Sequence, residues 1–136
     1  MELEIVLAGV TGRVTLLDKA APKATAALWA ALPIKDRAVQ VKWSGDAWRT
    51  EGNYDLGVNE IENEGHVLSA GDLIHFPRSK KIGIAYGRAE WRHPDLSLVM
   101  HVSVIGKVTA NLEELNKAGE RVWMEGAQPL LLTRLK

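Results

Sequence analysis

Asp72-Leu73-Ile74-His75-Phe76, followed after a short gap by Ile82-Gly83-Ile84-Ala85-Tyr86, is the stretch that decides the fold class of this chain. Both runs are short, rich in apolar residues and bounded by Gly or Pro, which is typical of β-strands. Pro77 and a basic cluster of Arg78, Lys80 and Lys81 separate them and predict a solvated turn. The sequence therefore predicts a pair of neighbouring strands here.

Further strands are expected on both sides of this pair. Glu2–Leu7 and residues 12–17 alternate apolar and polar side chains, which predicts a first hairpin. Residues 38–43 and 47–49 predict a second hairpin around a Ser-Gly-Asp turn. The remaining strands are expected at residues 56–58, 96–105, 120–125 and 129–135.

Two short helices are expected between the strands. Pro22 suits the first turn of a helix, and an apolar stripe follows it until Pro33. Asn111 is a favourable N-cap with the acidic Glu114 three residues later, and this second helix is expected to end before Gly119.

Many short strands with two short helices predict a mainly β barrel or sandwich, with a mostly antiparallel sheet. The length of 136 residues fits one domain, so residues 1–136 are expected to form a single domain. The sequence has no Cys, which excludes thiolate catalysis, cysteine zinc sites and disulfides and favours a reducing cytoplasm.

The charge balance argues against two classes of partner. Seventeen Lys and Arg residues balance seventeen Asp and Glu residues, so no excess positive charge is available to attract nucleic acid. The N-terminus is acidic where a secretory signal is basic, and no apolar run is long enough to span a membrane. We therefore expect a cytoplasmic protein that binds neither nucleic acid nor membrane.

Several segments, taken in order, resemble the short bacterial branch of the cyclophilin-like superfamily. They are residues 12–25 with the helix at 28–33, residues 70–77, residues 82–87, and residues 104–108 with 111–115. The resemblance implies a closed or nearly closed cyclophilin-like β-barrel, mainly β and mostly antiparallel, with two short helices.

A finer resemblance is carried by Trp43-Ser44-Gly45, Glu62-Asn63 and Gly71-Asp72, which are similar to the uncharacterised DUF3830 type. Prolyl isomerases of the superfamily carry a Phe-His-Arg motif and a Gln-Phe-Phe motif, and neither occurs in this sequence. The resemblance therefore implies the fold without the isomerase activity.

Six residues, in the irregular stretch 50–71 and the strands beside it, are predicted to line a ligand cleft, because long irregular segments in compact domains are often functional. The predicted catalytic residues are Glu62, His75 and Arg88, and the predicted ligand-binding residues are Trp48, Asn63 and Trp91.

For each of these residues, the sequence allows both a functional and a purely structural interpretation. A partly buried Glu62 suits acid-base work, whereas an acidic loop explains it equally. Arg88 suits a carboxylate clamp, or a surface ion pair with a neighbouring acid. His75 points away from its neighbours Ile74 and Phe76, toward either core or cleft. Trp91 is expected either to line a pocket or to pack in the core. Trp48 follows a turn and is the tryptophan expected at the surface.

No metal site and no cofactor are expected. His66 and His75 with a nearby Glu match no common ligand spacing, and the residues after Pro77 lack the His of a cupin metal site. The sequence also has no Gly-rich phosphate loop and no Gly-x-Ser-x-Gly elbow.

The function expected from these features is binding of a small organic carboxylate or amide in a cleft, with room for metal-free acid-base catalysis. Whether the protein is an enzyme is left open. The alternatives are a non-catalytic peptide or protein interaction module and a prolyl isomerase with a divergent site. Homo-oligomerisation is also left open, because exposed strand edges often pair.

Overall fold

The computed structural model describes residues 1–95 and 98–135 and consists mainly of β-strands. The strands are β1 (Glu2–Leu7), β2 (Val10–Leu16), β3 (Ile34–Gln40), β4 (Gly45–Thr50), β5 (Glu64–Gly65), β6 (Val67–Leu68), β7 (Asp72–Phe76), β8 (Lys81–Glu90), β9 (Val102–Ala110) and β10 (Gln128–Arg134). The helices are α1 (Pro22–Ala31) and α2 (Leu112–Glu125), with a 3-10 turn η1 (Lys42–Ser44).

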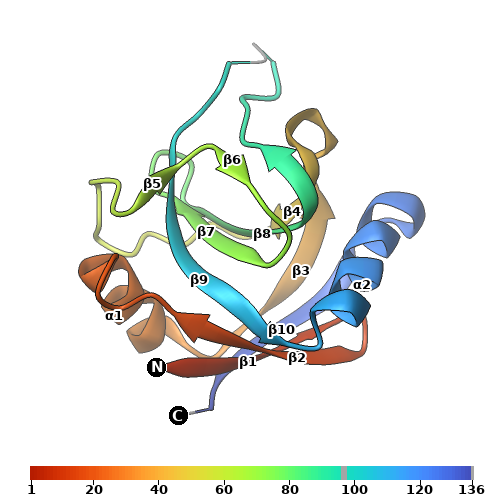
Figure 1. Cartoon of the computed structure of the whole chain (residues 1–136), viewed down its shortest axis with the longest axis horizontal. Helices are drawn as coiled ribbons and strands as arrows, with labels where there is room; N and C mark the ends of the chain where they lie inside the picture. The colour runs from red at the N-terminus through yellow and green to blue at the C-terminus, as the bar shows by residue number, and fades with distance from the viewer. Residues whose placement is uncertain (96–97, 136) are drawn as a thin grey trace.

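The strands close into an eight-stranded antiparallel barrel. The order is β2-β1-β10-β3-β4-β8-β7-β9, and β9 pairs back onto β2. The short strands β5 and β6 lie outside this ring and pair with β9 and β8. Figure 1 shows the two helices on opposite sides of the barrel. The predicted barrel, its antiparallel sheet and its two helices are confirmed.

Two apolar clusters lie on opposite faces of the same strands. The interior cluster contains Trp48, Leu73 and Ile84, together with the apolar faces of both helices. The outer cluster takes the alternate positions of β4, β7 and β8, such as Ala47 and Ile74. Because neighbouring residues of a strand point to opposite faces, each of these strands contributes side chains to both clusters.

Several predicted elements are confirmed: the first hairpin, α1, β7 and the last strand. The second helix differs from the prediction, because α2 continues through Gly119 to Glu125 and residues 120–125 form no strand. Gly119 lies against the Tyr86 ring, where an added Cβ would come within 2.5 Å of it. Gly119 therefore allows α2 to pack closely against the barrel, and it does not end the helix.

Other boundaries were also predicted wrongly. Residues 56–58 form no strand, and β3 begins at Ile34 and ends at Gln40, before η1. Of the strand expected at 96–105, residues 96 and 97 lie outside the described residues, and β9 begins only at Val102. Val99 instead forms an isolated antiparallel bridge with Arg92, so residues 98–100 run back alongside residues 91–93.

In the part of the chain that the structure describes, no helix is both long enough and apolar enough to cross a membrane.

Candidate functional site

A cavity of about 190 Å³ opens on the outer face of β4, β7 and β8, and we call it the Arg49 pocket. Its lining combines aromatic and cationic side chains: Val41, Trp43, Arg49, Phe76, Ser79, Lys81, Trp91, Arg92, His93 and Pro94. These described lining residues include no Asp or Glu. The pocket is therefore apolar in its walls and positive in its charge.

Strand alternation places Arg49 in this pocket. Trp48 points into the barrel and is 1% exposed, so Arg49, the next residue of β4, points to the outer face. Its partner in β8 is Gly83, which has no side chain. A Cβ on Gly83 would lie 3.0 Å from the Trp91 ring, so the glycine lets the indole lie close to the sheet beside Arg49.

Backbone hydrogen bonds fix the segment that carries Trp91. The amide of Trp91 donates to the carbonyl of His66 at 2.9 Å, and its carbonyl accepts from the amide of Met100 at 2.7 Å. The amide of Arg92 donates to the Oγ of the buried Ser44 at 2.9 Å. The wall made by Trp91 and its neighbours is thus anchored to η1 and to the β5–β6 connection.

Arg49 itself is left without a polar partner. Its Nε is buried and has no hydrogen-bond partner in the described structure. The guanidinium carbon lies 5.9 Å from the centre of the Trp43 ring, which is a weak cation-π contact. Partial burial lowers the pKa of Arg49, because the charged form loses hydration. The guanidinium that lines the pocket is therefore a poorly hydrated cation, and a charged donor of this kind suits an anionic ligand.

Lys81 adds a second positive charge and is only 9% exposed. Its Nζ donates to the carbonyl of Glu51 at 2.7 Å and to that of Gly52 at 3.4 Å. Burial lowers the pKa of Lys81, and the charge of Arg49 lowers it further. Predicted as part of a solvated turn, Lys81 is instead the first residue of β8 and faces the outer cluster.

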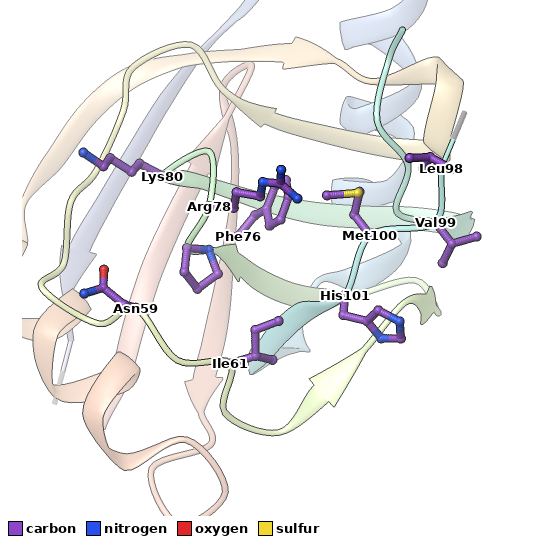
Figure 2. Close-up of a pocket in the computed structure, with 10 residues that line it drawn as sticks. Asn59, Ile61, Phe76, Arg78, Lys80, Leu98, Val99, Met100 and His101 are labelled. Atoms are coloured by element: carbon purple, nitrogen blue, oxygen red, sulfur yellow. The ribbon is translucent and has the colours of Figure 1, made fainter. Parts of the chain in front are cut away.

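A larger cavity of about 760 Å³ lies next to the Arg49 pocket, and we call it the apolar cavity. Its lining is mostly aliphatic or aromatic and also includes two cations: Asn59, Ile61, Phe76, Pro77, Arg78, Lys80, Leu98, Val99, Met100 and His101. Figure 2 shows Met100 extending toward Phe76 and Arg78. Phe76 lines both cavities.

The residues predicted from sequence to form one site lie in several places. Trp91 lines the Arg49 pocket. Trp48 and His75 are buried on the interior side of the barrel wall. Arg88 is exposed on β8 and lines a separate depression with residues 67–70.

Glu62 and Asn63 have structural contacts in the long loop. The carboxylate of Glu62 accepts hydrogen bonds from the amides of Lys23 at 3.3 Å and Ala24 at 2.7 Å, in the first turn of α1. Asn63 has a φ of 53° and its side-chain amide donates to the carbonyl of Val104 at 2.9 Å. The Glu62 side chain therefore holds the loop to α1, and the Asn63 side chain holds it to β9. A role for either residue in ligand binding stays a prediction.

The sequence reasoning missed Arg49, Lys81 and His93 as pocket residues. The signal for Arg49 was available, because an alternating strand with Trp48 inside must place Arg49 outside. The signal for Lys81 was its position directly before the strand of residues 82–86. Nothing in the sequence indicated that residues 91–94 fold over this face.

His66, His101 and Glu64 lie close together beside β5. His101 Nδ1 lies 2.6 Å from Glu64 Oε1, and the ring of His66 packs edge-on against that of His101. Within residues 1–95 and 98–135, no three His, Asp or Glu side chains are grouped to hold a metal ion.

Comparisons with known proteins support the fold and leave the function open. A family model described as "Protein of unknown function (DUF3830)" matches residues 3–134. No functionally curated protein matches the chain.

Two solved structures share the fold. The hypothetical protein AF2241 from Archaeoglobus fulgidus is 22% identical with a TM-score of 0.63, and the match covers 99% of this chain and 95% of that one. McbB in complex with tryptophan is 17% identical with a TM-score of 0.79, and the match covers 97% of this chain but only 44% of McbB. Identities this low show a shared fold alone.

Proposed function

Because the chain belongs to the DUF3830 family, whose description assigns no function, we propose one from its geometry: the protein binds a small organic carboxylate in the Arg49 pocket. The observation that carries the proposal is the Arg49 guanidinium, which is partly buried between aromatic side chains with its Nε unpaired. A carboxylate presents two oxygens that match the donors of a guanidinium.

The contacts of the Arg49 side chain do not compensate for its partial burial. A buried donor without a partner costs roughly 1–3 kcal/mol of stability. No carboxylate of the described residues forms an ion pair with Arg49 to offset this cost, and its contact with Trp43 is weak. An anionic ligand in the pocket would balance the charge of the guanidinium.

The walls of the pocket indicate the rest of the ligand. Trp43, Phe76 and Trp91 offer aromatic surface on which a ring or an apolar chain can pack. McbB, which shares the fold, was solved in complex with tryptophan, a molecule that has both an aromatic ring and a carboxylate. This supports a ligand in which an acid is joined to an apolar group.

Acid-base chemistry at this site would use His93 rather than a carboxylate. Its Nδ1 accepts a hydrogen bond from the amide of Asp95 at 3.1 Å, which leaves Nε2 as the donor in the neutral ring. An imidazole is the side chain best suited to exchange protons near neutral pH. Binding is the primary proposal, and metal-free catalysis by His93 is its extension.

The test pairs an arginine in the pocket with one outside it. Small aromatic and aliphatic carboxylates, each with its primary amide, are titrated calorimetrically into wild type, Arg49→Leu and Arg88→Leu. We expect the carboxylates to bind wild type and Arg88→Leu, and to bind Arg49→Leu at least about tenfold more weakly, since a hydrogen bond to a charged group is worth roughly 1.5–3 kcal/mol. The amides should bind more weakly than the acids.

The same variants separate binding from folding. Arg49→Leu should melt at the same temperature as wild type or higher, because an unpaired buried donor is removed. Carboxylate affinity that is unchanged in Arg49→Leu would disprove the site. A protein that binds no acid but captures peptides would favour the interaction module, and catalysed prolyl isomerisation would favour the divergent isomerase.

A further inference from the structure

The Arg49 pocket is too small to hold a whole ligand of ordinary size. Small-molecule sites usually occupy roughly 300–1,000 Å³, whereas this pocket has about 190 Å³. At roughly 30 Å³ per water molecule, it has room for about six waters or a ligand group of that bulk. The apolar cavity beside it, at about 760 Å³, falls within the usual range.

The wall between the two cavities is thin. Phe76 lines both and is 9% exposed. Ser79 lines the Arg49 pocket, while the residues on either side of it, Arg78 and Lys80, line the apolar cavity. A single aromatic ring and one short loop therefore separate the cationic pocket from the apolar cavity on this side.

A second stretch of chain also serves both cavities. Residues 91–94 form a first arm that lines the Arg49 pocket, and residues 98–100 form a second arm that lines the apolar cavity. The amide of His93 donates to the carbonyl of Leu98 at 2.8 Å, which holds the two arms side by side. The two cavities are thus neighbouring halves of one surface.

The apolar cavity exposes aliphatic side chains that a folded protein normally buries. Ile61 is 41% exposed, Leu98 is 55% exposed and Val99 is 38% exposed. Exposed apolar side chains gathered in a hollow mark a binding surface more often than scattered ones do. Figure 2 shows Leu98 and Ile61 on either side of Met100, and Val99 pointing away from it.

We propose that the ligand is an amphipathic acid whose carboxylate binds Arg49 and whose apolar tail passes Phe76 into the apolar cavity. The proposal rests on the proposed function and names its ligand class. The head of such a ligand meets the unpaired guanidinium, and its tail covers Ile61, Leu98 and Met100. A charged group at one end and an apolar chain at the other match the arrangement of the two cavities.

The experiment uses straight-chain carboxylates from butanoate to decanoate, below their micelle concentrations, with the primary alcohols of equal length as compounds that lack the acid. Binding is measured by calorimetry on wild type, Ile61→Asn, Leu98→Asn and the matched control Val67→Asn. Val67 is 56% exposed and lies outside both cavities. All the substituted side chains are exposed, so the variants should fold, and Asn adds no charge that repels the ligand.

In wild type and Val67→Asn, we expect the Kd to fall about three- to fourfold for each added methylene, which is the usual gain from burying one. In Ile61→Asn and Leu98→Asn, this gain per methylene should fall to less than half, while the Kd of butanoate stays the same. The alcohols should bind at least about tenfold more weakly than the acids of equal length.

Three results would overturn the proposal. If affinity does not depend on chain length but short acids still require Arg49, the ligand is confined to the Arg49 pocket and only the proposed function survives. A length dependence that Ile61→Asn and Leu98→Asn leave unchanged would place the tail elsewhere. If no carboxylate of any length binds, this inference and the proposed function both fail.

Discussion

His75 is a titratable side chain enclosed within the barrel wall. It is 1% exposed, its Nε2 donates to the carbonyl of Tyr54 at 3.4 Å, and its Nδ1 has no hydrogen-bond partner in the described structure. Burial lowers the pKa of His75, and the weaker effects of the Tyr54 carbonyl and of the Asp55 charge do not reverse this. The folded protein therefore holds His75 in its neutral form.

The stability of the protein should fall in mild acid because of this residue. The unfolded chain binds a proton on His75 below about pH 6.5, whereas the folded chain resists protonation. The contribution is therefore complete above that pH and is lost as the pH falls toward the lowered pKa of the folded state. The cost is at most about 1.4 kcal/mol per pH unit.

His75→Gln tests this, because the Gln amide can keep the bond to Tyr54 but does not titrate. Urea unfolding between pH 7.5 and 5 should show a flatter pH dependence for His75→Gln than for wild type. Equal slopes for wild type and His75→Gln would show that His75 is protonated as easily in the folded state as in the unfolded chain.

At the level of single residues, the structure does not bring the six residues predicted to share one site into a single pocket. Arg88 was predicted to bind a carboxylate ligand, but its side chain lies exposed on the surface of the barrel. The arginine that enters a pocket is Arg49, and Trp48 lies inside the barrel instead of at the surface. Which side chains of β4 point into the barrel depends on how distant strands close the sheet. A local sequence pattern does not show this closure.

At the level of elements, α1 depends on a residue far away in the sequence. Its N-cap residue, Ala21, makes no side-chain hydrogen bond to the helix. The carboxylate of Glu62 takes this role across the fold, bonding to two first-turn amides. A negative charge at a helix N-terminus also interacts favourably with the helix dipole.

Glu62→Ala should therefore lower the free energy of unfolding by about 0.5–2 kcal/mol, the usual cost of losing an N-cap. Chemical denaturation measures this against Glu60→Ala, an exposed neighbour that should change stability little. Carboxylate affinity should be the same in both variants, since Glu62 is not part of the Arg49 pocket lining. If instead stability stays at the wild-type value and binding is lost, Glu62 has the catalytic or binding role first predicted for it.

Some strands and helices were predicted correctly from sequence patterns, and others were not. Clean alternation or bounded apolar runs identified β1, β7 and β10, since their periodicity reflects the barrel they build. The end of α2 was misjudged because Gly119 was taken as a stop signal, whereas it makes room for Tyr86. The short strands β5 and β6 carry too few residues to show any period, and they form only through pairing with β9 and β8.

At the level of the whole molecule, the interior and outer clusters should unfold together. Strands β4, β7 and β8 carry one side chain into the barrel and the next into the outer cluster, so separation of these strands disrupts both clusters at once. Trp48 reports on the interior cluster and Trp91 on the outer one. If residues 1–136 form one cooperative domain, both must lose their native environment at the same denaturant concentration.

Fluorine NMR on protein labelled with 5-fluorotryptophan can follow the five tryptophans separately through a urea titration. Trp48→Phe and Trp91→Phe assign the two resonances, and far-UV circular dichroism follows the backbone. We expect all three midpoints to coincide, and a bound carboxylate to shift them together by the same amount. A Trp91 resonance that disappears at lower urea than the Trp48 resonance would show instead that residues 91–94 open on their own, with the Arg49 pocket exposed before the barrel unfolds.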